Sequence, residues 1–394
     1  MTTPASAAET ILIRVTGVDQ PGITTAIMGI LAHAGAVVLD IEQMVVRGRL
    51  NLEVVVDVSA GHDVLKDVLL VGWERDLDVD FDVVDEAPVP SSAGLVVSVL
   101  GPSLSPADLQ AVTAGIAKAG GNIERIQRLA NEPVYCYEFE VRGGDGREMR
   151  AHLLDAAAAA SDFDVAIQRT GLARRSQRLI VLDVDSTLIQ NEMIDLLAAE
   201  AGIGDACAAI TDSAMAGTLD FEESLRQRVR LLEGQPREII DRAYLRLELT
   251  DGAERFVRTV RRLGYRIAIV SGGFNSFTDR LRSDLGIDYS YANTLEVRDG
   301  VLTGGVTGPI VDRNAKASLL QAIAQQEGVS LEQVVAVGDG ANDLDMLSAA
   351  GLGIAFCAKP VVRDRADTTL SAPHLDAVLF LLGFRREDVD DADA

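Results

Sequence analysis

The apolar residues of this chain form three short runs with strand character, which lie far apart in the sequence. Leu179–Leu182, Ile267–Val270 and Val334–Val337 are each four consecutive apolar residues rich in β-branched side chains. Runs without polar alternation are typical of strands that are buried on both faces of a parallel sheet. We therefore expect an α/β domain over residues 176–388, in which these runs are neighbouring core strands.

The segment between the first and second runs has a different pattern. Residues 193–250 alternate polar and apolar positions with helical spacing and show little strand character. We expect an inserted helical cap that closes over the strand ends, because such lids exclude water and complete a site.

The amino-terminal part of the chain contains an internal repeat. Strands are predicted at residues 11–15, 36–46, 50–58 and 77–84, with helices to about residue 34 and over 62–71. The pattern starts again at Leu95, and equivalent residues stand 84 to 85 positions apart, as in Gly17 and Gly101 or Glu53 and Glu138. We expect two βαββαβ units of ferredoxin-like fold, at residues 8–88 and 93–170. The alanine run at 156–160 is predicted to be helical.

Composition and charge indicate a folded protein and argue against some classes of binding partner. The chain has 394 residues, of which 48% are hydrophobic, so it has enough apolar surface for several packed domains. A formal charge of −24 argues against nucleic-acid and anionic-membrane partners, which both favour basic surfaces. The three cysteines have no metal-ligand spacing, and we find neither a signal peptide nor a long apolar span. We expect a soluble cytoplasmic protein.

The first apolar run ends in two acids that point to a metal. Asp183 and Asp185 are two residues apart, so in a strand they face the same way. Open α/β sheets bind ligands beyond the carboxyl ends of their strands. Two carboxylates at one strand end repel each other unless a proton or a cation relieves them, and Mg²⁺ prefers oxygen ligands. A pair of solvated acids in a loop is the alternative reading of these two residues alone.

The other two runs end in residues that suit a phosphoryl group. Ser271-Gly272-Gly273 follows the second run, Gly338–Asp343 follows the third, and Lys316 lies between them. In their order and residue types, these segments resemble the four motifs of the haloacid dehalogenase superfamily, whose phosphatases use an aspartate nucleophile. The resemblance implies a Rossmann-like core with a cap and a metal-dependent phosphatase activity.

A closer resemblance covers residues 178 to about 376. The segment running from Asp183 to Glu192, the segment Phe221–Arg228, and the motifs at 271–274, 314–316, 338–343 and 355–360 resemble the phosphoserine phosphatase family. This resemblance implies Mg²⁺-dependent hydrolysis of O-phospho-L-serine to L-serine and phosphate, the last step of serine biosynthesis.

The family resemblance also implies roles for single residues. Asp183 would be the nucleophile that forms an aspartyl-phosphate, and Asp185 the general acid and base. The metal would be held by the carboxylates of Asp183 and Asp339 and by the backbone carbonyl of Asp185. The remaining phosphoryl oxygens would be bound by a group of polar residues: Ser271, the Gly272 N–H, Lys316 and Asn342. Asp343 would brace Lys316 or the waters of the metal.

The amino-acid end of the substrate needs one partner for each of its charges. By the same resemblance, Glu192 would meet the ammonium and Arg228 the carboxylate, with Met215 and Phe221 as an apolar wall. Arg226 and Arg228 lie on different faces of the expected helix, so only one of them is expected to reach the substrate.

The repeated units suggest regulation. Asp19-Gln20-Pro21-Gly22-Ile23 in the first unit resembles the ACT family of amino-acid-binding regulatory domains, and the second unit has the same plan without this string. We expect L-serine to bind at Gly17, Asp19 and Gly22, to inhibit, and to do so in a homodimer formed through these domains. Packing modules without a ligand are the alternative.

Other functions remain open from the sequence. A broad-specificity phosphatase is one, although Glu192 together with Arg228 favours an amino-acid ester. A phosphotransferase would pass the phosphoryl group to another hydroxyl, such as that of homoserine. A non-enzymatic amino-acid sensor on an inactive scaffold is disfavoured, because Asp183, Asp185, Lys316 and Asp339 are all present.

Overall fold

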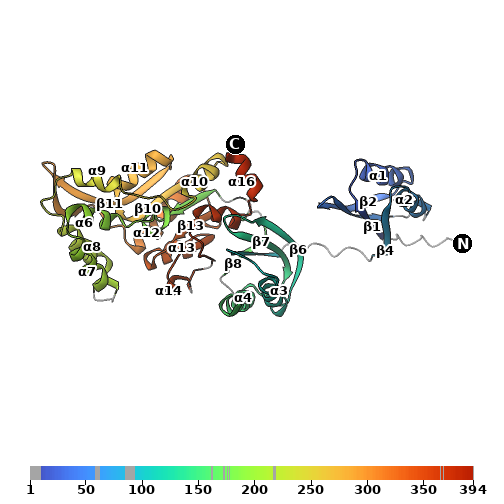
Figure 1. Cartoon of the computed structure of the whole chain (residues 1–394), viewed down its shortest axis with the longest axis horizontal. Coiled ribbons are helices and arrows are strands. Elements are labelled where there is room, and N and C mark those ends of the chain that lie inside the picture. Colours follow the sequence, from blue (N-terminus) through green and yellow to red (C-terminus); the bar gives the residue numbers. More distant parts are fainter. Residues whose placement is uncertain are drawn as a thin grey trace. The chain divides into compact units, whose positions relative to one another are not determined.

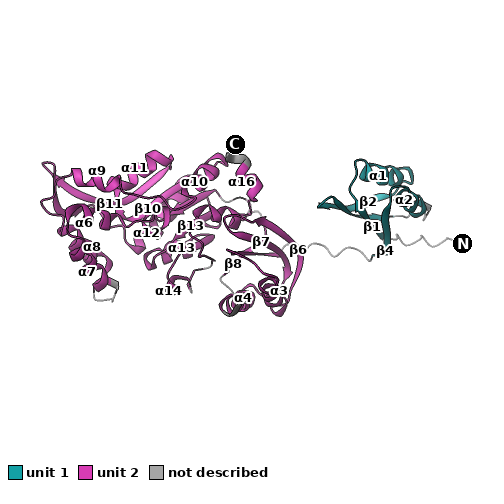
Figure 2. Ribbon diagram, in the orientation of Figure 1, with its two compact units in different colours: residues 1–91 teal, residues 92–394 magenta. Residues whose placement is uncertain are grey.

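The computed structural model divides the chain into two compact units, residues 1–91 and 92–394 (Figure 2). The side chains of residues 63, 159–160, 215 and 391–393 are not described. The described ranges are 10–57, 63–84, 94–160, 163–171, 174, 176, 178–215, 219–363, 365–366 and 368–393. Within these ranges, no helix is both long and apolar enough to cross a membrane.

The first unit is one βαββαβ repeat, labelled in Figure 1. Its four strands form an antiparallel sheet in the order β2-β3-β1-β4. Side chains of β1 alternate between the buried core and the other face of the sheet, as the period of a strand requires. The elements are β1 (Thr10–Val18), α1 (Ile23–His33), β2 (Val37–Val46), β3 (Arg49–Asp57), α2 (Asp63–Glu74) and β4 (Leu77–Val83).

The edge strand β2 of this unit is exposed along its whole length. All ten of its residues are exposed, including several large apolar side chains: Val37, Leu39, Ile41, Met44, Val45 and Val46. An exposed apolar edge strand has unpaired backbone groups that can pair with another strand.

The second repeat begins the other unit and has the same topology. Its sheet has the order β6-β7-β5-β8 and is antiparallel throughout. The alanine run lies in α4, as the sequence predicts. The elements are β5 (Gly94–Gly101), α3 (Pro106–Lys118), β6 (Gly121–Ala130), β7 (Tyr135–Gly143), α4 (Gly146–Ala160) and β8 (Asp164–Arg169).

The two repeats differ at the start of their first helix. In the first repeat Gly22 caps α1 with φ +89°, a conformation that favours glycine, and no side chain caps the helix. The first turn of α1 contains no acid. In the second repeat Ser105 and Asp108 form a capping box, in which the Asp108 carboxylate accepts the Ser105 N–H at 2.8 Å. The α3 terminus therefore carries its own carboxylate, whereas the α1 terminus does not.

The rest of the second unit is an α/β domain around a seven-stranded sheet. The strand order is β12-β11-β10-β9-β13-β14-β15, and all neighbours are parallel except the antiparallel pair β11 and β12. The three apolar runs of the sequence are the central strands β9, β10 and β13, as predicted. The strands are β9 (Leu179–Leu182), β10 (Arg266–Phe274), β11 (Tyr289–Arg298), β12 (Val301–Thr307), β13 (Val334–Gly338), β14 (Leu352–Phe356) and β15 (Thr368–Leu370).

Helices cover both faces of this sheet, so its central strands have no polar face. In β9, Leu179 and Val181 belong to one buried cluster, and Ile180 and Leu182 belong to the other. This arrangement explains why the runs show no alternation. The longer helices around the sheet are α10 (Ala253–Arg262), α11 (Asn275–Leu285), α12 (Arg313–Glu327), α13 (Leu344–Ala349) and α16 (Arg386–Asp393).

The segment after β9 forms the expected helical insertion. It contains α6 (Met193–Ala201), α7 (Gly204–Met215), α8 (Phe221–Arg230) and α9 (Glu238–Tyr244). The hairpin β11–β12, which the sequence did not predict, packs against α8 and extends the sheet beneath the insertion.

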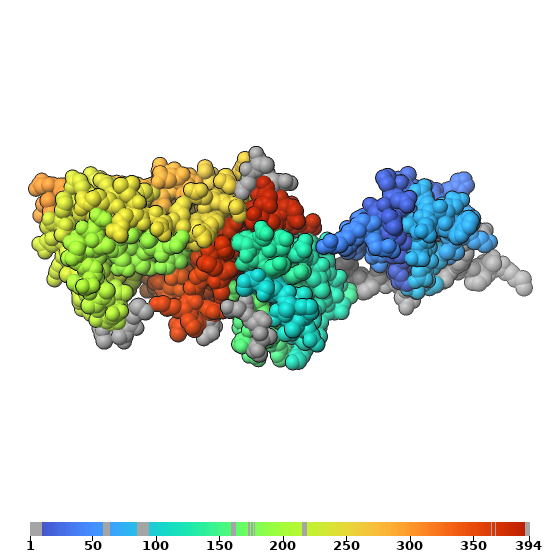
Figure 3. Space-filling model, in the orientation of Figure 1, coloured from blue at the N-terminus to red at the C-terminus, as the bar shows by residue number. Residues whose placement is uncertain are grey.

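The second repeat shares a buried interface with the α/β domain. In Figure 3 the repeat (teal) lies against the C-terminal segment (red). Apolar residues of the repeat belong to the same buried cluster as residues 375–382. At the polar part of the interface Asp164 on β8, which is 5% exposed, accepts hydrogen bonds from Thr369 Oγ1 at 2.9 Å, the Ser371 N–H at 2.6 Å and Ser371 Oγ at 2.9 Å. The apolar residues contributed by the repeat are Leu100, Leu129, Ala130, Val134, Cys136 and Ala166.

Candidate active site

The candidate site lies where the three central strands end. Strand β9 lies between β10 and β13, and Leu182 pairs in register with Ile269 on one side and Val337 on the other. Asp183, Ser271 and Asp339 therefore lie at the same edge of the sheet, where the carboxyl ends of these parallel strands meet. The Asp183 N–H donates to the Val337 carbonyl at 2.8 Å, which holds the first acid against β13.

The chain turns sharply after Asp183, and this turn presents the second acid. Residues Val184–Leu188 form a wide turn in which Ser186 has φ +57°, a left-handed conformation that is uncommon outside glycine. The Ser186 hydroxyl donates to Glu192 Oε1 at 2.8 Å. The hydrogen bond from Ser186, the residue after Asp185, thus holds Glu192 next to this turn. Neither Asp185 nor Glu192 lies in a regular strand.

Lys316 is the cation at the bottom of the site. Its side chain is fully buried, with Nζ 2.8 Å from Asp183 Oδ1 and 2.7 Å from Asp343 Oδ1. Burial alone would lower the pKa of Lys316, but the two carboxylates outweigh it and hold the pKa above its ordinary value. Lys316 therefore stays protonated and fixes the Asp183 carboxylate.

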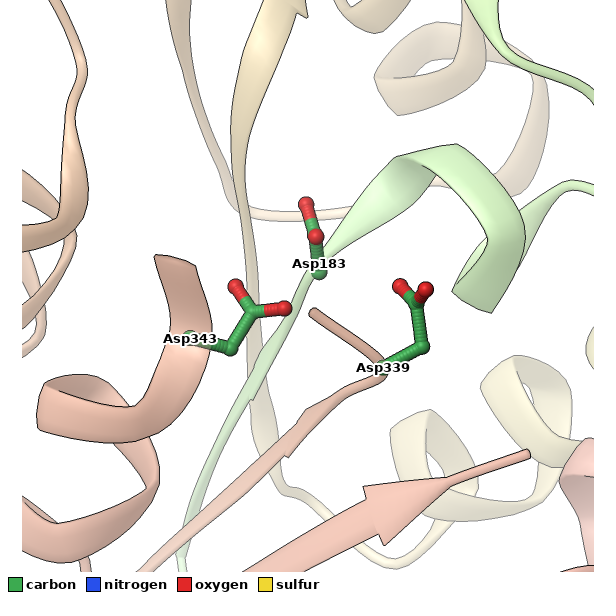
Figure 4. A group of neighbouring side chains, drawn as sticks. All are labelled: Asp183, Asp339 and Asp343. Carbon is green, nitrogen blue, oxygen red and sulfur yellow. The ribbon is translucent and has the colours of Figure 1, made fainter. Parts of the chain in front are cut away.

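A third carboxylate, that of Asp339, lies close to the two that bind Lys316. Figure 4 shows Asp183 at the end of β9, with Asp339 and Asp343 on either side of it. Carboxylate oxygens of the three residues lie within 4.8 Å of one another. Burial, followed by the charge of Asp343, raises the pKa of Asp183 well above its ordinary value, and the same two causes raise the pKa of Asp339 to about 6. The described side chains alone leave this cluster with an excess of negative charge.

A hard divalent cation fits this charge and donor set. Both oxygens of Asp343 are engaged, one by Lys316 and the other by the Gly340 N–H at 2.9 Å. Asp183 and Asp339 therefore remain as the carboxylates best able to bind an ion. Oxygen donors with this excess charge suit Mg²⁺ or a similar cation.

Asp185 lies beside the acidic cluster, and both oxygens of its carboxylate accept hydrogen bonds. Its Oδ1 accepts the Met193 N–H at 2.7 Å, and its Oδ2 accepts the Ser271 hydroxyl at 2.9 Å. Burial raises the pKa of Asp185, and these two donors oppose the shift. Gly273 is required here, because a Cβ at this position would lie 2.8 Å from Asp185 Oδ2.

A cavity of about 490 Å³ opens above these groups, between the sheet edge and the cap. The cap closes over the sheet at Phe221, whose ring lies so near Gly272 that a Cβ there would be 2.8 Å from Phe221 Cζ. The lining includes predicted residues from both sides: Asp183, Asp185, Glu192, Phe221, Arg228, Gly272, Asp339 and Asn342. The site therefore combines residues from segments as far as 159 positions apart, 183 and 342.

The two ends of the cavity differ in chemistry. Glu192 and Arg228 lie on the cap side, and burial, followed by the charge of Asp185, raises the pKa of Glu192 to about 7. The Arg228 Nε donates to the Ser224 carbonyl at 3.4 Å. Arg226 forms an exposed ion pair with Glu222 and does not line this cavity, so of these two arginines Arg228 is the one that the structure places in the site.

The remaining predicted positions lie elsewhere. The side chain of Met215 is outside the described part of the structure. Gly17, Asp19 and Gly22 all lie in the first unit, at the end of β1 and the start of α1.

Two further residues of the site were not given a role from the sequence. Thr187 donates to Asp339 Oδ1 at 3.2 Å, and Arg313 at the start of α12 lines the cavity. Thr187 directly follows the two acids, so it could have been noticed, whereas no local pattern marks Arg313.

Comparison with known proteins agrees with this fold and site. Residues 180–348 match the model of haloacid dehalogenase-like hydrolases, and residues 9–82 and 93–168 each match an ACT domain model. The fold and the acidic strand end thus define a metal-dependent phosphatase of the haloacid dehalogenase class.

Similar proteins of comparable length are known. The chain is 47% identical over 389 residues to the phosphoserine phosphatase of Streptomyces coelicolor, which covers 98% of this chain and 94% of that protein. It is also 47% identical over 392 residues to a phosphoserine phosphatase of Mycobacterium tuberculosis, with 98% and 95% covered. A substrate-bound phosphoserine phosphatase structure matches with 46% identity and a TM-score of 0.50, covering 52% of this chain and 98% of that one. The chain belongs to the phosphoserine phosphatase family, with two ACT domains before the hydrolase domain.

Proposed function

We propose that this chain hydrolyses O-phospho-L-serine to L-serine and phosphate through an aspartyl-phosphate on Asp183. The observation that carries the proposal is the cavity in which Asp183, held by Lys316, lies opposite Glu192 and Arg228 on the cap. The phosphate ester of an amino acid needs a site for the phosphoryl group at one end of the cavity. At the other end it needs an anionic partner for its ammonium group and a cationic partner for its carboxylate.

The proposed reaction uses groups already in position. Asp183 attacks phosphorus, and Lys316 opposes the rise in the Asp183 pKa and holds the carboxylate aligned. Asp185 gives its proton to the departing serine oxygen and then removes one from the water that hydrolyses the intermediate. The raised pKa of Asp185 favours the protonated form that the first step requires. A divalent ion, when bound, would neutralise the charge between two anionic reactants.

The phosphoryl oxygens are proposed to meet donors on the sheet side. Ser271, the Gly272 N–H and Lys316 come from β10 and α12, and Asn342 follows β13. Donors fixed in this way stabilise the charge that develops in the transition state. In the free protein Ser271 donates to Asp185, so it would exchange this partner for a phosphoryl oxygen.

We propose Mg²⁺ as the ion, held by Asp183, Asp339 and the backbone carbonyl of Asp185. The oxygen donors support a hard divalent cation, a class that includes Mg²⁺ and Mn²⁺. Removal of metal with EDTA should abolish phosphate release, and titration with each cation should identify which one restores it at the lowest concentration.

The function is tested by phosphate release from a panel of monoesters with Mg²⁺ present. O-phospho-L-serine should be preferred over O-phospho-L-threonine, O-phospho-L-tyrosine and p-nitrophenyl phosphate. Similar rates on all four would contradict the assignment of Glu192 and Arg228 to the amino-acid end. The relatives compared above are named phosphatases, so we propose water as the acceptor. An unchanged yield of free phosphate in the presence of homoserine would agree with this.

We also propose that L-serine inhibits by binding to the first ACT domain, at Gly17, Asp19 and Gly22. The open start of α1 supports this, because helix N–H groups without a capping side chain attract a carboxylate. The capping box at α3 argues against a matching site in the second domain. Asp19→Ala should remove serine inhibition, and Ser103→Ala, at the equivalent loop position, should retain it. Equal sensitivity of both variants and the wild type would place the inhibition at the active site instead.

Assembly as a homodimer through the ACT domains is proposed on the exposed apolar edge of β2. Replacing Ile41 and Val45 by lysine should convert a dimer to a monomer in light scattering. A wild-type monomer at micromolar concentration would contradict the proposal. The cytoplasmic location expected from the sequence stays a prediction.

A further inference from the structure

We propose that Arg313 is a second substrate-binding arginine, which draws the phosphate dianion into the site and holds inorganic phosphate after the reaction. The inference rests on the proposed function, because it assigns a phosphate-binding role to a residue beside the proposed phosphoryl site. It extends that function to a residue for which no catalytic motif supplies a role.

The position of Arg313 places it at the phosphate end of the cavity. It is the first residue of α12, and it stands three residues before Lys316, so both point to the same side of the helix. Arg313 lines the cavity together with Ala341 and Asn342, which follow β13. Arg228, by contrast, lies on cap helix α8. The two arginines therefore belong to different parts of the domain.

The guanidinium group of Arg313 is only partly satisfied. It forms an ion pair with Asp345 on α13, and the two side chains are 41% and 37% exposed. An ion pair this exposed is weak, because water screens it. The Arg313 Nε is buried and has no hydrogen-bond partner among the described residues. A buried donor without an acceptor is costly, so a further anionic partner of this guanidinium group would stabilise it.

The charge of the site explains why such a residue is needed. Four acids line the cavity, namely Asp183, Asp185, Glu192 and Asp339, and the whole chain has a formal charge of −24. A phosphate dianion that approaches this surface is repelled until it meets a local cation. Lys316 is fully buried and already bound by two carboxylates. Arg313 is the partly exposed cation on the sheet side, so it is suited to the first contact with the dianion.

The test compares Arg313→Gln with Asp345→Asn in the Mg²⁺-loaded full-length protein. Binding of inorganic phosphate is measured by titration calorimetry, which needs no activity, and KM and kcat are measured on O-phospho-L-serine. Arg313→Gln should weaken phosphate binding about tenfold and raise KM more than it lowers kcat. Asp345→Asn breaks the same ion pair but leaves the arginine free, so it should bind phosphate as tightly as the wild type or more tightly.

Two further variants separate this role from others. Arg313→Lys keeps the charge and should recover part of the phosphate affinity. Arg365→Gln removes one exposed positive charge that acts on Asp345 but does not line the cavity, and it should leave phosphate binding unchanged. The wild-type kcat/KM should fall more steeply with ionic strength than that of Arg313→Gln.

Equal losses in Arg313→Gln and Asp345→Asn would show that the ion pair is structural and would overturn the inference. Unchanged phosphate affinity in Arg313→Gln would overturn it as well. If the wild type binds phosphate through Arg313 but releases none from O-phospho-L-serine, the proposed function fails and the inference about Arg313 survives.

Discussion

Asp164 offers the sharpest test of how the second ACT domain is joined to the hydrolase domain. The change Asp164→Ala removes a buried carboxylate that accepts three hydrogen bonds from the Thr369 and Ser371 groups. A hydrogen bond to a charged group contributes about 1.5–3 kcal/mol, but such contributions are not additive, and water can reach the partly buried Ser371. The Arg363 ion pair, at 3.8 Å and 40% exposed on the arginine side, adds little.

We therefore expect Asp164→Ala to lower the free energy of unfolding of the second unit by about 3 kcal/mol, close to the loss of one or two such bonds. For a unit that spans residues 92–394, that loss corresponds to a decrease in Tm of roughly 4–6 °C. Differential scanning calorimetry is the suitable assay. The single tryptophan, Trp73, lies in the first unit and is 82% exposed, so its fluorescence does not report this transition.

Matched variants make the result interpretable. Asp164→Asn keeps one accepting oxygen and should lose less stability than Asp164→Ala. Asp155→Ala removes an exposed acid from α4 in the same domain and should change stability by less than about 0.5 kcal/mol. A Tm for Asp164→Ala within 1 °C of the wild type would refute the reasoning, because it would mean that the buried carboxylate contributes nothing to holding the two domains together.

The other predictions concern the active site. Asp183→Asn should abolish phosphate release without unfolding the protein, because an amide cannot act as the nucleophile. Circular dichroism checks that the fold is kept, and a phosphate assay checks that activity is lost. Measurable turnover would contradict the role of Asp183 as the nucleophile. Arg228→Ala should cost about 2–5 kcal/mol in kcat/KM on O-phospho-L-serine but much less on p-nitrophenyl phosphate, and equal losses would indicate a structural arginine. The raised pKa of Asp339, about 6, means that the metal-free fold loses stability as pH rises through that value. The increase in Tm caused by Mg²⁺ should therefore be small at pH 5 and larger above pH 7, and a pH-independent increase would exclude Asp339 as a ligand.

The sequence predicted the parts of this molecule that local patterns encode. The three apolar runs became β9, β10 and β13 because strands buried on both faces need no polar alternation. Their shared edge then brought Asp183, Ser271 and Asp339 together, since parallel strands end on the same side. The repeat was visible because both copies conserve the spacing of glycine and glutamate residues.

Features that depend on distant contacts could not be predicted. Asp164 looks like any acid at the start of a strand, and its partners lie more than 200 residues away in the sequence. Arg313 is one of many arginines in the chain, and only the fold places it in the cavity. The β11–β12 hairpin, by contrast, has a local signal that the sequence analysis overlooked: the two-residue turn Asp299-Gly300, in which both residues have a positive φ. For Asp164 and Arg313 the determining contacts are long-range, so no local window of the sequence contains them.

Under the proposed regulation, the capping box of α3 would limit how steeply this enzyme can respond to an amino acid. A Hill coefficient cannot exceed the number of coupled sites. Because Asp108 already occupies the helix start in the second domain, the proposal leaves one effector site per chain. A single chain would then give a hyperbolic inhibition curve. A Hill coefficient above one for serine would accordingly report communication between chains, so the shape of a dose–response curve becomes a measure of assembly.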